Sequence, residues 1–481
     1  MKSQSPFETP HTINCRFGRF GQRAIVVGAS MAGLLAARVL SEHFSEVRIF
    51  DRDAVADDAN PRPGVPQSLH LHAMLPRGLQ VLNQLFPGIS NDLEADGSIP
   101  LDIANDIAWL TPKGWGLRFQ SGLHGLSFTR DLLDCHVRRR VRRLPNVRFQ
   151  DRHDVIGFLS GNLGEVVGVR VQQRTPGLRG AVENISADLV VVASGRQSAI
   201  ADWFAALGLP RCQATIINAH IGYATRILRR PAQYIPSWKA IILQAAPPKI
   251  TRAGLIFPIE ADRWMCTLIG GDRDYPPADE KGFLEFAHSL SSPALHNALR
   301  STEPLTPIRC YRATDNRRYD FSQISNWPKG VVVLGDALCA FNPVYGQGMT
   351  TAALEADLLA RLLRHQTRDE QLEATFQKEA ARVVSGPWTL ATSADLRYRS
   401  VEGARASLRT RIVHWYVDEV LWLGTCNQWA RKRFLEVQGM LRDASAIFQP
   451  DMIGRVLLGL LSRRSFSSRA AKLEKFSEIA V

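Results

Sequence analysis

The sequence is poor in the features that mark several protein classes. Its 481 residues contain seven cysteines, at positions 15, 135, 212, 266, 310, 339 and 426, and no two of them form a Cys-x-x-Cys pair. The odd number and the spacing argue against a disulfide framework and against a tetrahedral zinc site. No apolar run approaches the length of a membrane span, and the first twenty-three residues lack the apolar core of a signal peptide. We therefore expect free thiols and a cytoplasmic protein.

The net charge of the chain does not by itself indicate a function. The chain has 59 Lys and Arg against 46 Asp and Glu, a formal charge of +13, but its basic residues are scattered. The one dense cluster, residues 138–143, continues a helical pattern from Leu132, so it predicts a solvated helix face and no nucleic-acid partner. The apolar, basic-flanked segment 453–464 has two interpretations, a helix packed on the C-terminal lobe or one lying in a membrane interface. Peripheral membrane contact stays open.

Apolar periodicity and turn residues predict alternating strands and helices. At 45% hydrophobic and 22% charged residues, the composition is that of a globular enzyme with two lobes. Residues 1–23 are polar and aperiodic, which predicts a flexible arm. The predicted strands are 24–27, 47–50, 155–159, 166–172, 188–193, 215–221, 240–243, 255–259, 264–269 and 331–334, with a turn near 176–177. The predicted helices end at Leu40 or span 69–85, 128–144 and 348–363, and residues 370–481 read as mainly helical.

The first motif with chemical content is Gly28-Ala-Ser-Met-Ala-Gly33, between a strand and a helix. A glycine-rich turn at this place lets backbone N–H groups and the helix N-terminus face a pyrophosphate. Ser30 stands where the usual pattern has its middle glycine. Asp51 ends the next strand, eighteen residues after Gly33, where a carboxylate can accept hydrogen bonds from ribose hydroxyls. Together they predict a nucleotide site, and a tight turn without a nucleotide is the alternative.

The second motif begins at the end of the strand 331–334. Asp336 follows that strand, and the loop Asn342-Pro-Val-Tyr-Gly-Gln-Gly348 precedes a helix. A carboxylate at a strand end can bind a polyol chain such as ribitol. Pro343 and two glycines make an open loop that a flat ring can approach. The positive end of the following helix would face a ring that becomes anionic on reduction, as a flavin does.

With these motifs and with Ser194-Gly195-Arg196 after the strand 188–193, the chain resembles the class A flavoprotein monooxygenases, the family of para-hydroxybenzoate hydroxylase and squalene epoxidase. The resemblance covers roughly residues 24–365. It implies that Asp336 meets the ribitol, that residues 343–348 line the isoalloxazine, that Arg130 reaches the phosphate or ribityl region, and that the Val155 backbone meets adenine. The residues it assigns to non-covalently bound FAD are Gly28, Ser30, Gly33, Asp51, Arg52, Arg130, Val155, Asp336, Pro343, Gly346, Gln347, Gly348 and Met349.

The resemblance also implies the architecture. The expected fold is α/β, with a Rossmann-like FAD-binding domain over residues 24–210 and 325–365. An inserted antiparallel β-sheet substrate domain is expected over 211–324, and a helical C-terminal region over 366–481. Within the substrate domain, Phe257, Trp264, Met265 and Leu268 are candidate walls of an apolar substrate site, and packing in the core of the sheet is the alternative for most of them.

A narrower likeness, to the flavin epoxidases of bacterial polyether biosynthesis, rests on Arg62 to Gln67, Leu69 to Leu75 and Asn342 to Met349. That group also tolerates serine at the position of Ser30. The likeness makes His70 and Gln67 the candidate flavin-proximal catalytic residues. His70 and His72 would diverge on the predicted helix 69–85 and no third ligand stands at useful spacing, so we expect no metal site. A capping or packing role is the alternative to a flavin-proximal role for these histidines. The Trp-x-Trp-x-Ile-Pro pattern of flavin halogenases is absent.

The implied activity is that of a monooxygenase. Reduced flavin combines with O₂ at its C4a atom, and the hydroperoxide transfers one oxygen atom to an apolar unsaturated or aromatic small molecule by epoxidation or hydroxylation. Such chemistry needs no catalytic triad, and none is visible. NAD(P)H is the expected electron donor, and a separate flavin reductase is the alternative. Two competing functions remain: a flavin-dependent reductase of isoprenoid-type double bonds, and a binding protein that uses its basic face on membranes or nucleic acid.

Overall fold

The computed structural model describes residues 20–175, 178–234, 236–321, 324–365 and 371–461 of the chain. Its centre is a five-stranded sheet in the order β20-β11-β1-β2-β7, in which every neighbouring pair is parallel. The strands are β1 (Gly21–Val27), β2 (Phe44–Phe50), β7 (Val147–Gln150), β11 (Leu189–Val192) and β20 (Val331–Val333). β11 and β20 are runs of Val and Leu that are buried along their whole length, as expected for a sheet covered on both faces. The predicted Rossmann-like core is confirmed.

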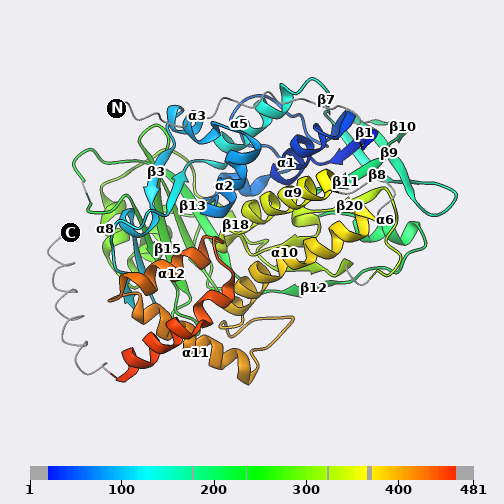
Figure 1. The fold of residues 1–481 in the computed structure, drawn as a ribbon. Helices are drawn as coiled ribbons and strands as arrows, with labels where there is room; N and C mark the ends of the chain where they lie inside the picture. The colour runs from blue at the N-terminus through cyan, green and yellow to red at the C-terminus, as the bar shows by residue number, and fades with distance from the viewer. Residues whose placement is uncertain (1–19, 176–177, 235, 322–323, 366–370, 462–481) are drawn as a thin grey trace, which may run out of the picture.

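Helices pack against this central sheet, and a small antiparallel sheet forms a further layer of the same domain. α1 (Met31–Leu40), α9 (Gly348–His365) and α10 (Leu372–Asp395) lie side by side, and α5 (Arg130–Arg142) packs against α1 (Figure 1). The predicted β-meander is confirmed as an antiparallel sheet of β8 (His153–Ser160), β9 (Val166–Thr175) and β10 (Leu178–Ser186). The predicted turn at 176–177 lies outside the described residues. Short elements connect these layers: α3 (Ile89–Ala95), α4 (Ile103–Asp106), α6 (Ile200–Ala206), and the pair β3 (Ile99–Asp102) and β6 (His124–Ser127).

A large, mainly antiparallel sheet forms the second lobe. Its order is β17-β13-β16-β15-β14-β4-β5, with β18 also paired to β13. The strands are β4 (Ile107–Thr111), β5 (Gly114–Trp115), β13 (Gly222–Arg229), β14 (Ala240–Leu243), β15 (Arg252–Ile259), β16 (Arg263–Gly270), β17 (Glu303–Pro304) and β18 (Arg309–Tyr311). α7 (Glu280–His288) and α8 (Ala294–Arg300) contribute to the apolar cluster on one face. Because β4 pairs in parallel with β14, the sheet takes strands from both sides of residue 210.

The predicted strand 215–221 is confirmed only over residues 215–217, which lie in β12 (Ala214–Ile217), because the chain leaves that strand after Ile217 and enters the large sheet only at Gly222. β12 pairs with β19 (Asn316–Tyr319), which in turn pairs with β21 (Cys339–Ala340). His220 adopts a left-handed backbone with φ 49°, and its N–H donates to the side chain of Asn218 at 2.9 Å. This local turn competes with strand pairing. β13, the strand that follows it, lies inside the large sheet.

The predicted helix 69–85 is also shorter than its apolar pattern. A 3₁₀ turn, η1 (Pro66–Leu69), is followed by extended chain, and α2 (Pro76–Leu85) begins only at Pro76. Proline disfavours helical backbone at the residue before it and lacks an N–H, so it suits the first turn of a helix. His70 and His72 therefore lie on extended chain. At the N-terminus, β1 begins at Gly21, so only residues 1–19 of the predicted arm lie outside the described residues.

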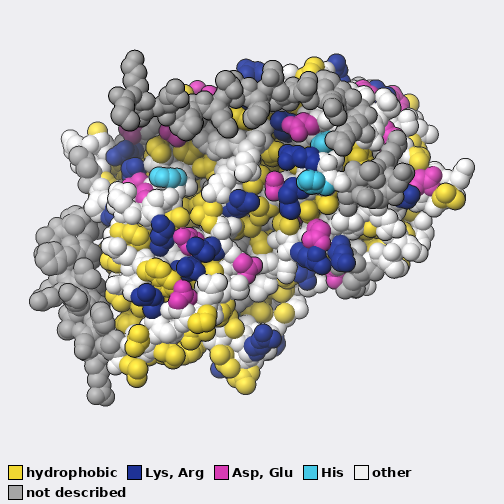
Figure 2. All heavy atoms as spheres, viewed as in Figure 1, with side chains coloured by type: hydrophobic (Ala, Val, Ile, Leu, Met, Phe, Trp, Pro, Cys, Tyr) yellow, Lys and Arg dark blue, Asp and Glu magenta, His cyan; other side chains and the backbone are white. Residues whose placement is uncertain are grey.

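The C-terminal region is helical, as predicted. It contains α11 (Leu408–Leu423), α12 (Gln428–Gln438), the 3₁₀ turn η5 (Ala444–Phe448) and a helix over 450–461. Within the described ranges, no helix is long and apolar enough to cross a membrane. Figure 2 shows hydrophobic side chains gathered with Lys and Arg on the lower part of the molecule, where α11 lies in Figure 1.

Candidate functional site

Four parallel strands end at one edge of the central sheet, and each is followed by a residue of the sequence motifs. Gly28 follows β1, Asp51 follows β2, Arg196 lies shortly after β11 and Asp336 after β20. The carboxyl ends of parallel strands are where open α/β sheets bind ligands. The sequence motifs, which lie up to three hundred residues apart, therefore converge on one edge.

The turn from β1 to α1 depends on two glycines. Gly28 has φ 106°, a conformation that side chains with a Cβ rarely adopt. A Cβ on Gly33 would lie 1.9 Å from the Gly28 carbonyl oxygen, so only glycine lets the helix pack this closely. Ser30 stands at the N-cap of α1, but its side chain makes no capping bond. Its Oγ instead accepts a hydrogen bond from Nη2 of Arg130 at 3.1 Å.

The Asp51 carboxylate is held by hydrogen bonds from nearby backbone N–H groups. Its Oδ2 accepts from the N–H of Ala29 at 2.6 Å, and its Oδ1 accepts from the N–H of Asp53 at 2.9 Å. Arg62 closes the same corner, because its Nη2 donates to the Ala29 carbonyl at 2.9 Å and its Nη1 lies 3.7 Å from Oδ2 of Asp51. β8 begins beside Asp51, since the N–H of His153 donates to the Asp51 carbonyl at 2.9 Å.

The Asp336 side chain is half-buried, and the charges of two arginines act on its carboxyl group. Burial raises the pKa of Asp336, while the charges of Arg196 and Arg130 lower it. No described residue donates a hydrogen bond to this carboxyl group. Gly335, with φ 65°, fixes the turn and donates its N–H to Glu355 of α9 at 2.6 Å. Burial raises the pKa of Glu355 to about 8, so this side chain is mostly protonated at neutral pH.

The loop 342–348 is anchored by a carboxyl group that lies outside the sequence motifs. Asp395, the last residue of α10, accepts hydrogen bonds from Oη of Tyr345 at 2.5 Å, Nδ2 of Asn316 at 2.6 Å and Nδ2 of Asn342 at 3.3 Å. Asp395 is fully buried, and that burial raises its pKa to about 7. The loop contains the 3₁₀ turn η4 (Pro343–Tyr345) and ends where α9 begins. Asp395 therefore fixes the geometry of the predicted flavin loop.

His70 lies where the central domain meets the large sheet. Its Nδ1 is 2.8 Å from Oγ1 of Thr225, and Oγ1 of Thr225 is 2.8 Å from Oγ1 of Thr267. The imidazole contacts Tyr223 edge-on, with ring centroids 4.7 Å apart, and Tyr311 at 5.6 Å. Burial lowers the pKa of His70 to about 4, so it is neutral at pH 7. The hydrogen bonds from His70 to Thr225 and Thr267 run onto the sheet, and Tyr223, which contacts His70, packs in one apolar cluster with Val344 of the loop 342–348.

One face of the large sheet is only partly covered. On β14 and β15 the residues alternate, with Ile241 and Ile256 fully buried against the α7–α8 side and Ile242, Leu255 and Phe257 half-buried on the other. We call the second side the inner face. The strand period of two places Met265 on this face as the partner of Phe257. Trp264 and Leu268 belong to the cluster on the opposite face, so they are not walls of an inner-face site, contrary to the sequence-based expectation.

Two buried polar atoms at the edge of the central sheet make no hydrogen bond to the described residues. Nη1 of Arg62 and Oε1 of Gln347 are buried without a hydrogen-bond partner. Together with the Asp336 carboxyl group and the N-termini of α1 and α9, they offer donors and acceptors to a long ligand that carries both hydroxyls and negative charge. The residues present therefore fit FAD.

The remaining predicted residues take less central places. Arg52 is exposed, Gln67 is half-buried in η1, and Val155 is half-buried at an irregular position of β8. Met349 is 6% exposed and packs in the main core. Gly346 is left-handed at φ 66°, and a Cβ there would lie 3.3 Å from Ala73. His70 was a candidate from sequence, but nothing in the sequence pointed to Asp395, Asn316, Thr225 or Thr267, because they come from four separate elements.

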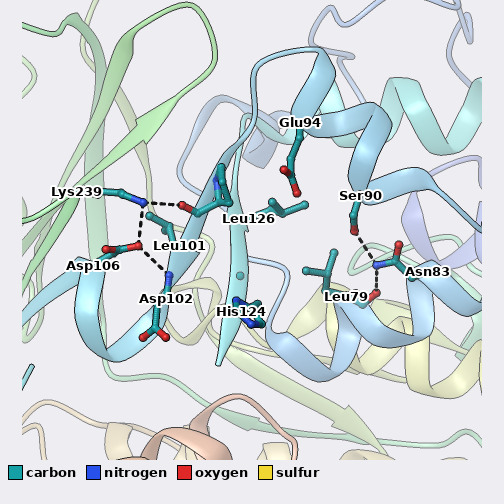
Figure 3. A pocket seen from close by; sticks show the side chains of 12 residues that line it. Leu79, Asn83, Ser90, Glu94, Leu101, Asp102, Asp106, His124, Leu126 and Lys239 are labelled. Atoms are coloured by element: carbon teal, nitrogen blue, oxygen red, sulfur yellow. Dashed lines mark hydrogen bonds and ion pairs between the residues drawn. The ribbon is translucent and has the colours of Figure 1, made fainter. Parts of the chain in front are cut away.

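A separate cavity of about 430 Å³ lies between α2, α3 and the β3–β6 pair (Figure 3). Two of its charged groups, Lys239 and Asp106, are paired with each other. Nζ of Lys239 lies 3.0 Å from Oδ2 of Asp106 and donates to the Pro100 carbonyl at 3.1 Å. Among the described residues, no group of three or more His, Cys, Asp and Glu side chains could hold a metal ion.

Comparisons with known proteins agree with this geometry. The family described as FAD binding domain matches residues 22–388. The protein Rv3254 of Mycobacterium tuberculosis is 31% identical over 392 residues, which cover 80% of this chain and 82% of that protein. The flavin-dependent brominase Bmp2 matches in fold with a TM-score of 0.63 at 14% identity, over 92% of this chain and 99% of the other.

Two oxygenases have the same fold. PqsL, a probable FAD-dependent monooxygenase from Pseudomonas aeruginosa, has a TM-score of 0.58 at 16% identity, over 78% of this chain and 97% of the other. The tetrameric 2-methyl-3-hydroxypyridine-5-carboxylic acid oxygenase has a TM-score of 0.57 at 18% identity, over 88% and 98%. At these identities the likeness establishes a common architecture.

Proposed function

This chain belongs to the FAD-binding domain family, and from that premise we propose that it is an FAD-dependent monooxygenase acting on an apolar small molecule. One observation carries the proposal. The loop 342–348 and a partly exposed apolar face of the large sheet meet in one apolar cluster, which holds Val344 and Leu255 together with Tyr223, the ring that His70 contacts. A flavin held at this loop would have an apolar substrate surface beside its ring.

The chain's own residues would divide the work of holding FAD. The N-terminus of α1, Ser30 and Arg130 would bind the diphosphate, and Asp51 the adenosine ribose. The Asp336 carboxyl group would accept from the ribityl hydroxyls. The loop that Asp395 anchors would place backbone N–H groups at the start of α9 toward the ring, where they favour negative charge.

Bound FAD supplies the redox chemistry: it takes a hydride or its equivalent from the donor and activates O₂. In the balanced reaction one oxygen atom enters the substrate and the other leaves as water, with NAD(P)H oxidised to NAD(P)⁺. The inner face would orient the substrate and exclude water, which protects such chemistry from side reactions. A neutral His70 next to Thr225 can hold a proton on one ring nitrogen while the other accepts.

The proposed substrate is unsaturated or aromatic, because an electrophilic oxygen needs electron-rich carbon. The partly exposed Ile242, Leu255 and Phe257 support an apolar molecule, and the motif likeness to polyether-type epoxidases supports an alkene. We therefore propose epoxidation of a carbon–carbon double bond, with hydroxylation of an aromatic ring as the second reaction to test. NAD(P)H is the proposed donor.

The test is substrate-stimulated oxidation of NADH and NADPH by the FAD-loaded protein, with and without oxygen and with an added flavin reductase. We expect turnover only in air, with one product oxygen derived from labelled O₂. Anaerobic reduction of an alkene would contradict oxygenation and favour a double-bond reductase. A protein that gains no flavin absorbance after incubation with FAD would contradict the whole proposal.

A further inference from the structure

Arg431 of α12 is a buried cation that has no anionic partner within the part of the chain that the structure describes. The residue is 2% exposed, and its Nε is buried with no hydrogen-bond partner. Its side chain makes no ion pair or hydrogen bond with any other described residue. Burial lowers the pKa of Arg431 to about 10, so the guanidinium still carries its charge at neutral pH. An uncompensated buried charge is costly, and proteins usually retain one only where something neutralises it.

The surroundings of Arg431 position the guanidinium and leave its charge unmatched. Its Cζ lies over the Trp109 ring, 5.1 Å from the ring centroid. A Cβ on Gly116 would lie 2.4 Å from the same Cζ, so the guanidinium rests directly on the Gly116 backbone. Nε1 of Trp109 donates to Oε1 of Gln244 at 3.0 Å, which fixes the indole under the arginine. A cation–π contact provides weak attraction but no counter-charge.

Trp109 stands at the far end of a row that crosses the inner face from His70. Strand register aligns one residue on each of five neighbouring strands, in the order Thr225, Thr267, Leu255, Ile242 and Trp109. Thr225 bonds His70 at one end of the row, and Trp109 meets Arg431 at the other. Four inter-strand spacings separate the ends, about 19 Å. Between them the exposed part of the row is apolar, at Leu255 and Ile242.

We propose that Arg431 binds the carboxylate of an elongated apolar substrate, whose other end lies at His70 beside the flavin loop. This inference rests on the monooxygenase function proposed above and adds the chemical class of its substrate, an apolar monocarboxylic acid. A guanidinium pairs with a carboxylate through two parallel hydrogen bonds, and a single cation matches the single charge of that group. The distance between Arg431 and His70 makes Arg431 a residue that selects the substrate and fixes which carbon reaches the flavin.

The decisive measurement compares two ligands of equal length on the FAD-loaded wild-type protein. Dodecanoate and dodecanol differ only in the charged end group. We expect dodecanoate to bind more tightly by about tenfold or more, because a buried guanidinium strengthens a charged hydrogen bond. Equal affinity of the two ligands, or tighter binding of the alcohol, would overturn the inference. FAD content and NAD(P)H oxidation are measured on the same preparation, so that a failure of the proposed function is seen separately.

Variants test whether Arg431 causes the preference for dodecanoate over dodecanol. In Arg431→Gln we expect the preference for dodecanoate to disappear while dodecanol affinity stays unchanged, and in Arg431→Lys we expect part of it to remain. Arg455→Gln is the matched control, because Arg455 also stacks on a tryptophan, with its Cζ 4.5 Å from the Trp429 centroid, but is exposed. A preference that survives in Arg431→Gln, or that is lost equally in Arg455→Gln, would contradict the assignment. If Arg431→Gln does not fold, the wild-type comparison of acid and alcohol still decides.

Discussion

Nη2 of Arg130 donates a hydrogen bond to Oγ of Ser30 at 3.1 Å, joining residues one hundred positions apart at the start of α1. Nε of Arg130 is fixed separately, by Oδ1 of Asp134 at 2.7 Å. This pair explains how the turn accommodates a serine where the usual fingerprint has glycine. The hydroxyl orients a guanidinium at the helix N-terminus, where both favour an anion.

Replacing Arg130 by alanine should weaken FAD binding. A charged hydrogen bond contributes about 1.5–3 kcal/mol, so the FAD dissociation constant should rise about ten- to a hundredfold. Fluorescence titration of the apoprotein with FAD measures this change. Arg139→Ala is the control, because Arg139 lies on the same helix but is exposed and donates to the Asp57 carbonyl. Equal loss in both variants would mean that Arg130 does not contact the cofactor.

Removing the Tyr345 hydroxyl should loosen the flavin loop. Tyr345→Phe keeps the ring but deletes the hydrogen bond to Oδ1 of Asp395, which should lower the free energy of unfolding by about 1–3 kcal/mol. Circular dichroism of the bound flavin should weaken as the loop loses its fixed geometry. Tyr319→Phe controls for loss of a hydroxyl elsewhere. A Tyr345→Phe protein with unchanged stability and flavin spectrum would show that Asp395 does not hold the loop.

Asp395 also predicts a dependence of stability on pH. Its folded-state pKa is raised to about 7, whereas an unfolded aspartate has a pKa of about 3.9. Between these values the folded state binds more protons, so the contribution of Asp395 to stability is full at low pH and falls as pH rises toward 7. We expect the melting temperature of the wild type to fall relative to that of Asp395→Asn from pH 5 to pH 7. A constant difference across that range would contradict burial of a titrating carboxyl group.

Changing His70 should uncouple NAD(P)H oxidation from product formation. In His70→Phe the ring remains but the polar chain to Thr225 is lost, so we expect product formation to fall about a hundredfold while NAD(P)H oxidation continues. Hydrogen peroxide release measures the lost coupling. Thr225→Val removes the partner hydroxyl of His70 with nearly the same shape and should uncouple to a smaller degree. If NAD(P)H oxidation stays fully coupled to product formation in His70→Phe, His70 takes no part in the reaction.

The exposed face of α11 predicts that the protein contacts membrane surfaces. Leu408, Ile412 and Trp415 recur at helical spacing and are 74%, 57% and 51% exposed. Exposed arginines accompany them at positions 405, 409 and 411. An apolar stripe flanked by cations suits an anionic lipid surface. We expect the protein to sediment with phosphatidylglycerol vesicles but not with phosphatidylcholine vesicles.

Two charge-introducing variants test that face. Ile412→Glu should abolish vesicle sedimentation, because it places a charge in the middle of the stripe. Ile216→Glu, at an exposed isoleucine of β12, should leave it unchanged. Sedimentation that persists in Ile412→Glu, or that does not distinguish the two lipids, would exclude α11 as the contact.

Several features of the site could be predicted because their signals are contiguous in the sequence. The turn Gly28–Gly33 and the loop after Asp336 require specific backbone geometry over a few residues, and glycine and proline encode that geometry directly. The predicted helix 69–85 was wrong at its N-terminal end for a related reason. Its apolar spacing was right, but Pro76 decided where the helix begins and left His70 on extended chain.

By itself, the sequence determined that one nucleotide site exists, that it lies at the ends of buried strands and that the fold is α/β. Only the tertiary structure decided which residues support it. Asp395 joins side chains from two other segments, β19 and the loop 342–348. The alternation along β16 separates Met265 from Trp264, and the register of five strands brings Trp109 into line with Thr225. Local motifs specify backbone conformation within a few residues, whereas register and buried hydrogen bonds depend on how distant segments pack.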